Sequence, residues 1–338
     1  MTSSTESKPS TELIIISLTS IKSREDALRE TIISLTKQDF RRRYEIRIYL
    51  SHEPYLLDCG FDSEPEWLSE LMRNNPLCTV KVFFVRNTGP YRKLLPALEE
   101  FIASKFGVIL ITCDDDTYYG PGWLSEILAR HYQTGSIVAF RGHSIKSSPD
   151  CAKLADYREW QLNKEKQQYC ISNLPTGKDG VVYRPHYFRR QVLNVDRAML
   201  LAPTADDLWF RWHTISTGVP CYLINIKGRS LDDAPSFDPN ISLWEEYNKK
   251  GGNDKTIELM ENYFISNFGF SVASILHTCR HLAGTELLTD ESAEKTHAVL
   301  SATRQLRCAS ILKEAPNHLL SLSARSYEIL RYSYSRKS

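Results

Sequence analysis

Residues 108–122 read VILITCDDDTYYGPG, and this stretch decides the fold. The apolar and β-branched residues 108–112 have the length and composition of a strand that is buried on both faces. Three consecutive aspartates follow this strand, and the turn-forming sequence Gly-Pro-Gly occupies positions 120–122. The pattern predicts a buried strand that ends in an acidic turn.

Strands and helices alternate in the sequence before this stretch. Apolar runs predict strands over 13–18, 44–50 and 80–85, and helical spacing of apolar residues predicts helices over 24–37 and 94–106. Such alternation requires crossover connections, which are almost always right-handed and give parallel strand pairs. We therefore expect an α/β fold with a Rossmann-like, mostly parallel sheet flanked by helices.

The second half of the chain is less regular. Strands are expected over 137–140 and 220–226, a helix over 205–215, and a glycine-containing loop that runs into a strand over 172–183. Beyond residue 262 the spacing is helical, with segments at 274–282 and 291–307. These changes in pattern predict three regions: a disordered tail (1–11), a main domain (12–262) and a helical C-terminal extension (263–338).

Composition and charge exclude several classes of protein. The 338 residues include 42 Lys and Arg against 41 Asp and Glu, and this balance argues against non-specific nucleic-acid binding, which needs a basic surface. Apolar residues make up 42%, which is ordinary for a globular protein, and no stretch approaches the roughly 20 apolar residues of a membrane span. The polar N-terminus lacks a secretory signal, and the eight cysteines contain no C-x-x-C pair, so we expect reduced thiols in a soluble, cytoplasmic protein.

Ligands of a Rossmann-like sheet bind beyond the carboxyl ends of its strands. Thr19, Ser20 and Arg24 follow the first predicted strand, and the aspartate triplet follows the strand at 108–112. The sequence lacks G-x-G-x-x-G after the first strand, and it lacks G-x-x-x-x-G-K-[ST] throughout. The absence of these motifs argues against Rossmann-type dinucleotide binding and against P-loop phosphate binding.

Asp114, Asp115 and Asp116 repel one another unless a cation or a hydrogen-bonding ligand compensates them. On an extended segment alternate residues point the same way, so Asp114 and Asp116 are expected to converge on one ligand while Asp115 turns aside. Hard oxygen ligands suit Mg²⁺ or Mn²⁺ that holds a substrate diphosphate. The alternative is a solvated acidic turn without a ligand.

Asp206 and Asp207 begin the helix predicted over 205–215. Acidic residues in a first turn complement the helix dipole, and this structural role explains an isolated pair. Beside a metal-type triplet, a carboxylate here is also a candidate general base for a hydroxyl nucleophile. Trp209 and Trp212, three residues apart on the same helix, are expected to pack in the core rather than stack on a sugar.

Six segments together resemble the nucleotide-sugar glycosyltransferases of the GT-A type, and more narrowly the family-2-like inverting enzymes. The resemblance covers about residues 12–262, and it lies in the order and spacing of ISLTSIKSR (16–24), TGPYRKLLPAL (88–98), LITCDDDTYYGPGWL (110–124), PTGKDGVVYRP (175–185), PTADDLW (203–209) and LWEEYNKKGGND (243–254).

The resemblance implies roles for individual residues. By the D-x-D motif, Asp116 would coordinate the metal and Asp114 would contact the ribose or the metal-bound water, with Asp115 counted among the donor-binding residues. Lys93 would supply positive charge to the donor phosphates. The resemblance also implies that Thr19, Ser20 and Arg24 line the nucleotide pocket. Lys178, Asp179 and Gly180 would form the loop that lies against the donor sugar and the acceptor. Asp207 would be the catalytic base, with Asp206 as its neighbour or as the alternate candidate.

Each implied role has a structural alternative. Arg24 also reads as a solvated arginine at a helix start, Lys93 as a surface lysine, and residues 178–180 as simple turn chemistry. Lys178 and Asp179 stand where the family pattern favours glycine, which leaves the sugar contact of this loop open.

The function implied is metal-dependent, inverting transfer of a sugar from a nucleoside-diphosphate sugar, with UDP favoured by the resemblance, to a hydroxyl of a glycan, glycolipid or glycoprotein. The cofactor expected is Mn²⁺ or Mg²⁺. Two alternatives are a nucleotidyltransferase, which usually carries a glycine-rich basic loop after the first strand, and a non-catalytic sugar-nucleotide-binding module. The basic, tyrosine-rich end of segment 263–338 allows peripheral membrane contact, whereas helical packing on the main domain or on a second subunit is the simpler interpretation.

Overall fold

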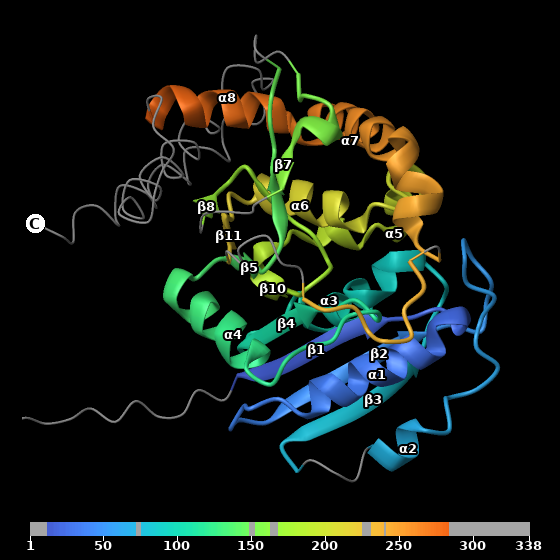
Figure 1. Ribbon diagram of the computed structural model, residues 1–338. Coiled ribbons are helices and arrows are strands. Elements are labelled where there is room, and N and C mark those ends of the chain that lie inside the picture. The colour runs from blue at the N-terminus through green and yellow to red at the C-terminus, as the bar shows by residue number, and fades with distance from the viewer. Residues whose placement is uncertain are drawn as a thin grey trace, which may run out of the picture.

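The computed structural model describes residues 12–71, 76–148, 153–162, 168–224, 231–239 and 241–283. Its centre is an eight-stranded sheet of order β3-β2-β1-β4-β10-β5-β11-β8, beside which lies a three-stranded sheet of order β7-β6-β9 (Figure 1). The strands are β1 (Leu13–Thr19), β2 (Tyr44–Leu50), β3 (Cys78–Phe84), β4 (Val108–Thr112), β5 (Ile137–Ala139), β6 (Gly142–Ser144), β7 (Gln161–Leu162), β8 (Gln168–Cys170), β9 (Asn173–Pro175), β10 (Val181–Tyr183) and β11 (Cys221–Leu223).

The large sheet is mostly parallel. Strand β1 pairs in parallel with both β2 and β4, and β2 pairs in parallel with β3. Strand β10 runs antiparallel between β4 and β5, so β5 and its parallel neighbour β11 share the direction of the first four strands. The mixed α/β fold with a mostly parallel central sheet is therefore confirmed.

Helices cover both faces of the sheet (Figure 1). Alternation along β1 decides which side chains meet them, because Ile14, Ile16 and Leu18 pack toward α1 and α4 while Ile15 packs on the opposite face with α3 and α6. The helices are α1 (Glu25–Thr36), α2 (Leu68–Leu71), α3 (Leu95–Phe101), α4 (Trp123–Thr134), α5 (Val195–Leu201), α6 (Asp206–Ser216), a π-helix (Trp244–Gly252), α7 (Asn253–Phe268) and α8 (Val272–Ala283).

Most predicted elements coincide with observed ones, and β2 has the predicted bounds. The helix expected over 94–106 is wrong in extent, because α3 ends at Phe101. There the Ser104 hydroxyl oxygen accepts the backbone N–H of Phe106 (3.1 Å), a local bond that competes with helical pairing. Cys59, Cys78, Cys113, Cys170 and Cys221 are free thiols.

The expected division after residue 262 falls inside α7. Buried residues of α7 and α8, among them Phe264 and Val272, belong to the same core cluster as α6 and one face of the sheet. The Glu261 carboxylate accepts the Trp212 indole N–H (2.8 Å) and the backbone N–H of Val272 (2.9 Å), so it ties α6, α7 and α8 together. The expected tail (1–11) and the helix expected over 291–307 lie outside the described residues.

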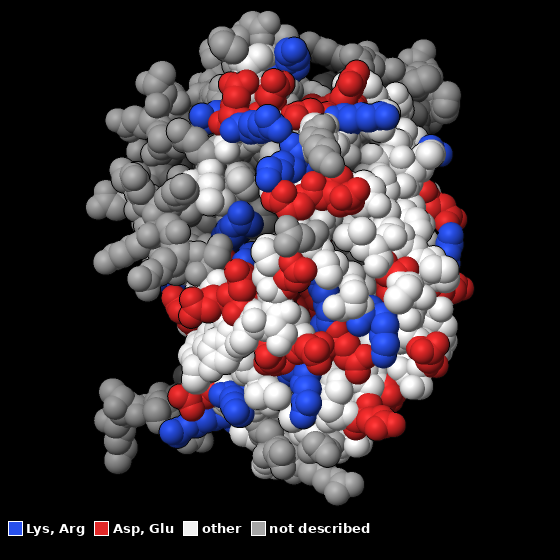
Figure 2. Space-filling view, turned by 45° about the vertical axis from the view of Figure 1, so that its right-hand side comes forward, with Lys and Arg blue, Asp and Glu red and all other residues white. Residues whose placement is uncertain are grey.

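Charged side chains are mixed over the surface. On the face drawn in Figure 2, neither the acidic nor the basic side chains of the described residues cover a large continuous area. Within the described ranges no helix combines the length and the apolar character needed to cross a membrane.

Helix α6 carries aromatic side chains into the core. Trp209 and Trp212 are both fully buried, which confirms their predicted packing role. His213, also fully buried, packs edge-on against Trp209 (ring centroids 4.5 Å apart) and Phe264 (5.0 Å). Burial, reinforced by the positive charge of Arg189, lowers the pKa of His213 to about 3. This histidine is therefore neutral in the folded protein.

A pH-dependent loss of stability follows from His213. In the unfolded chain its pKa returns to about 6.5, so the unfolded state gains a proton as pH falls below that value, and the folded state gains one only near pH 3. Between pH 7.5 and pH 5.0 the free energy of unfolding should fall by about 2 kcal/mol on account of this residue alone. Urea unfolding of His213→Phe at both pH values should show a correspondingly smaller loss than the wild type. Equal losses in His213→Phe and the wild type would contradict this account.

Candidate active site

A cavity of about 590 Å³ lies beyond the carboxyl ends of β1 and β4 and beside the first turn of α6. It is the place that the Rossmann-like sheet predicts for a ligand. The site residues expected from the sequence that line it are Thr19, Ser20, Arg24, Lys93, Asp114, Asp115, Asp116, Lys178, Asp206 and Asp207.

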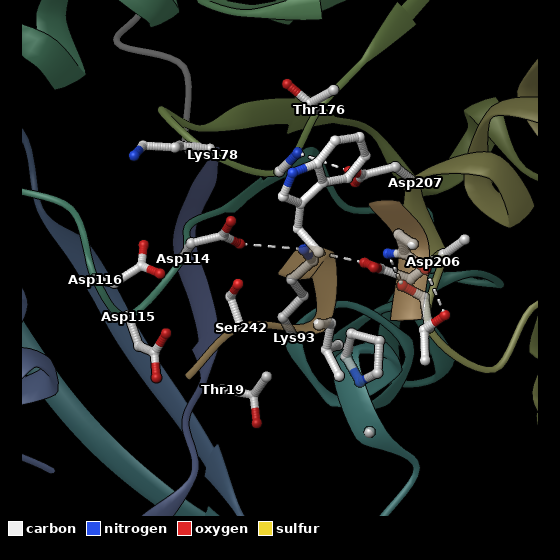
Figure 3. A pocket seen from close by; sticks show the side chains of 18 of the residues that line it. Thr19, Lys93, Asp114, Asp115, Asp116, Thr176, Lys178, Asp206, Asp207 and Ser242 are labelled. Carbon is white, nitrogen blue, oxygen red and sulfur yellow. Dashed lines mark hydrogen bonds and ion pairs between the residues drawn. The ribbon is translucent and has the colours of Figure 1, made fainter. Parts of the chain in front are cut away.

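The acidic triplet, labelled in Figure 3, leads into a turn at residues 115 and 116, and each of its three side chains has a hydrogen-bond or ion-pair partner. Asp115 accepts hydrogen bonds from the Ser20 hydroxyl and from Arg24 Nη1 (2.9 Å), and Asp116 accepts from the same Arg24 nitrogen (3.1 Å). The expectation that Asp115 turns aside is therefore wrong, because Asp115 shares Arg24 with Asp116, whereas the convergence of Asp114 and Asp116 on one ligand stays a prediction. The alternation on which it rested holds only for extended backbone, and the chain turns at residues 115 and 116.

Lys93 occupies the middle of the site. Its ammonium group is nearly buried and forms ion pairs with Asp114 Oδ1 (3.1 Å) and Asp206 Oδ2 (3.0 Å), as the dashed lines in Figure 3 show. Burial by itself lowers the pKa of Lys93, but the surrounding carboxylates outweigh burial and raise it well above the usual value. Lys93 is thus a charged group in the interior of the site, not a surface lysine.

The carboxylate of Asp114, in the acidic triplet, and that of Asp207, the candidate base, both lie close to Gly177. Its backbone N–H donates to Asp207 Oδ2 (3.0 Å). A Cβ atom at this position would lie 2.4 Å from Lys93 Nζ, 3.0 Å from Asp114 Oδ1 and 3.4 Å from Asp207 Oδ1. Any larger residue at this position would displace the Lys93 ammonium group and crowd the Asp114 carboxylate. The sequence analysis missed Gly177, although it stands in the loop that was singled out.

The loop residues 178–180 divide into two groups. Lys178 lines the cavity and forms an ion pair with Asp233. Asp179 is fully buried and accepts the backbone N–H of Leu231 (3.1 Å), and Gly180 lies against the Trp123 ring with φ +97°. The structure therefore places Asp179 and Gly180 behind the cavity wall, where they shape the turn.

A buried ion pair that the sequence did not predict lies at the end of the cavity that Thr19, Ser20 and Arg24 line. Arg92 Nη2 donates to Asp58 Oδ2 (2.8 Å), and both side chains are about 1% exposed. Arg92 Nη1 has no hydrogen-bond partner among the described residues. Their separation of 34 positions left no local signal for the pairing.

Two aspartates of the site have strongly raised pKa values. Burial, followed by repulsion from Asp115 and Asp114, raises the pKa of Asp116 to about 7. Burial, followed by repulsion from Asp206, raises the pKa of Asp207 to about 7. In both cases the protein's own cations compensate the carboxylates only in part.

Metal-ligating side chains do not form a complete cage here. Within the described ranges no three His, Cys, Asp or Glu residues are arranged to hold a metal ion. Asp114 and Asp116 nevertheless fit a Mg²⁺ or Mn²⁺ ion, because such ions are commonly bound by one or two carboxylates together with substrate phosphates and water.

No protein-family model and no curated protein matches this chain. Among solved structures it is similar to TarS of Staphylococcus aureus in complex with UDP (14% identity, 88% of this chain and 89% of that chain, TM-score 0.40). It is also similar to the mannosyltransferase PcManGT of Pyrobaculum calidifontis in complex with GDP-Man and Mn²⁺ (12% identity, 96% and 81%, TM-score 0.42). A third similar structure is 4-diphosphocytidyl-2C-methyl-D-erythritol synthase (10% identity, 70% and 96%, TM-score 0.36).

Removing the central cation should destabilise the protein. In Lys93→Met the carboxylates of Asp114 and Asp206 lose their buried partner, and we expect the free energy of unfolding to fall by about 3 kcal/mol at pH 7.5. Lys249→Met removes an exposed ion pair with Glu245 and should cost less than about 1 kcal/mol. Urea unfolding of both variants measures the difference, and similar costs would show that Lys93 does not compensate buried charge.

Proposed function

We propose that this protein is a metal-dependent, inverting glycosyltransferase that transfers a sugar from a nucleoside-diphosphate sugar to a hydroxyl group of an acceptor. The observation that carries the proposal is the meeting of Asp114 and Asp207 at Gly177, because it sets the D-x-D carboxylates beside a candidate base. The resemblance of six ordered segments to family-2-like GT-A enzymes supports the same activity.

The nucleotide is assigned to the end of the cavity formed by the segments that follow β1 and β3. Thr19, Ser20 and Arg24 line this end, together with the Asp58–Arg92 pair. The unpartnered Arg92 Nη1 offers a donor to a base carbonyl, and buried polar groups of this kind usually have a partner in the working state. The resemblance favours uridine as the base.

The charge of the site fits a divalent cation. Three carboxylates follow β4, Arg24 contacts two of them and Lys93 contacts the third, while the second ion pair of Lys93 is with Asp206. A diphosphate would add negative charge to this group. In the proposal Asp114 and Asp116 hold Mn²⁺ or Mg²⁺, which when bound neutralises the charge of the departing nucleoside diphosphate.

Asp207 is the proposed catalytic base and Asp206 is not. Asp206 is tied to Lys93, whereas Asp207 is held through one oxygen by the Gly177 N–H. As the acceptor oxygen attacks the anomeric carbon, the bond from that carbon to the diphosphate oxygen breaks and the acceptor proton passes to the Asp207 carboxylate. One displacement inverts the anomeric configuration, and no covalent intermediate is needed.

Product analysis tests the reaction class. Incubation of the purified protein with UDP-sugars and GDP-sugars, Mn²⁺ and a mixture of glycosides should release a nucleoside diphosphate and a glycoside of inverted configuration. Release of pyrophosphate from a nucleoside triphosphate would instead identify a nucleotidyltransferase, and binding without turnover would identify a sugar-nucleotide-binding module.

Loss of the base should abolish transfer and spare nucleotide binding. The amide of Asp207→Asn can still accept the Gly177 N–H but cannot take up a proton, so we expect the transfer rate to fall by about 100-fold or more. The Kd for UDP, measured by calorimetry, should stay within about twofold of the wild type, because the change lies outside the nucleotide end. Asp196→Asn, which alters an exposed surface aspartate, is the matched control. A rate for Asp207→Asn within about tenfold of the wild type would refute its role.

Loss of a metal ligand should instead weaken nucleotide binding. In calorimetry with UDP, Mn²⁺ should strengthen binding to the wild type, and the Asp116→Asn variant should lose about tenfold or more of that gain because one anionic ligand is gone. EDTA should weaken binding to the wild type and to Asp196→Asn alike. The metal assignment fails if EDTA leaves UDP binding unchanged.

A further inference from the structure

The cavity has a second wall that the proposed donor does not use. In Figure 3, Thr176 and Asp207 lie across Lys93 from Thr19, which marks the nucleotide end. The wall on the Asp207 side comes from the segment around β6, from the turn at Tyr157–Glu159 and from the π-helix. The residues of this second wall that carry the inference are Arg141, His143, Tyr157, Trp244, Asn248 and Asn253.

Aromatic rings form the outer part of the second wall. Tyr157 lies between His143 (ring centroids 5.3 Å apart) and Trp244 (6.3 Å), with tilted ring planes in both contacts. Trp244 is 45% exposed although it lines the cavity. A large aromatic side chain left half open at the mouth of a cavity is typical of a surface that a ligand covers.

The second wall is anchored to the catalytic elements. Asn248 of the π-helix exchanges two hydrogen bonds with Thr204 (2.7 and 3.0 Å), two residues before Asp206. The Tyr157 backbone N–H donates to Asp254 at the start of α7 (2.7 Å). π-helical turns occur frequently at functional sites. The hydrogen bonds of Asn248 and of the Tyr157 backbone fix the position of the aromatic rings relative to Asp207.

Two polar atoms of the second wall lack hydrogen-bond partners among the described residues. Asn253 is 94% buried, and its Oδ1 accepts no hydrogen bond. Arg141 donates through Nη1 to the Thr176 hydroxyl (3.2 Å), but its Nε donates to no described group. One unused acceptor and one unused donor suit a ligand rich in hydroxyl groups, because a hydroxyl both donates and accepts.

The charge of the second wall is small. Arg141 is its only arginine or lysine among the six residues named, and this guanidinium interacts electrostatically with the buried carboxylate of Asp179. His143 is neutral, since burial and the nearby Arg141 lower its pKa to about 4. An anionic ligand therefore finds no uncompensated positive group here.

We infer that the second wall is the acceptor subsite and that it takes an uncharged pyranose of a glycan, whose C–H face lies on Trp244 and Tyr157 while the reacting hydroxyl points toward Asp207. This inference rests on the proposed function. Aromatic stacking selects the apolar face of a sugar ring, and the unpaired atoms of Arg141 and Asn253 select its hydroxyl groups.

The test compares two aromatic residues of the π-helix. Transfer is measured with p-nitrophenyl pyranosides that are neutral (glucoside, galactoside, mannoside and N-acetylglucosaminide) or anionic (glucuronide), and UDP binding is measured by calorimetry on the same proteins. We expect Trp244→Ala to raise the KM for a neutral acceptor about tenfold and Trp244→Phe to raise it less than about threefold. Tyr247→Ala, which removes an exposed ring that does not line the cavity, should leave KM unchanged, and UDP affinity should stay constant throughout.

Three results would overturn the inference. An unchanged KM in Trp244→Ala would show that the acceptor does not stack on this ring. Transfer to the glucuronide alone would exclude an uncharged sugar as the acceptor. Transfer to none of these pyranosides, by a protein that binds UDP, would exclude a simple pyranose acceptor. All three leave the donor half of the proposed function standing. Failure of the wild type to bind any nucleotide would instead remove the proposed function itself.

Discussion

The buried ammonium group of Lys93 is the interaction on which the site depends. It bridges the carboxylate of Asp114, which follows β4, and the carboxylate of Asp206, which begins α6. The backbone carbonyl of Lys93 accepts a hydrogen bond from the hydroxyl of Ser17 in β1 (2.6 Å). Two segments far apart in the sequence thus share one cation, and a third, β1, holds the backbone of the residue that carries it. Because carboxylates at this depth repel one another, their close approach requires such a charge between them.

Arg24 plays a comparable part at the end of the cavity that we propose for the nucleotide. It joins the acidic turn through Asp115 and Asp116, and its Nε donates to the backbone carbonyl of Ile241 (3.0 Å) in the segment before the π-helix. Arg24 therefore connects the acidic turn to the segment that leads into the π-helix. Arg24, Lys93 and Asp207 are held in place by partners within the protein, which reduces the ordering that binding of a substrate would require.

Local sequence patterns predicted the strands and the edge at which the site lies, because apolar periodicity reports burial directly. They failed where one residue's environment is set by distant partners. The turn at Asp115 and Asp116 cancelled the alternation expected of extended backbone, and the glycine that lies against Lys93, Asp114 and Asp207 is Gly177, whereas Gly180 lies against Trp123. Nothing in the local pattern links Tyr157 to Trp244, since 87 positions separate two rings that only the tertiary fold brings together.

The hydrophobic cores on the two faces of the sheet also differ in the length of chain that supplies their residues. Among the residues that the structure describes, the core under α1 and α4 is built from residues between Ile14 and Ile224, whereas the core under α6 extends from Ile15 to Leu276 in α8. During synthesis the first core can close while the C-terminal helices are still within the ribosome, but the second cannot close until they have emerged. The nascent protein would thus expose one apolar face of its sheet for longer than the other, and that face adjoins the site.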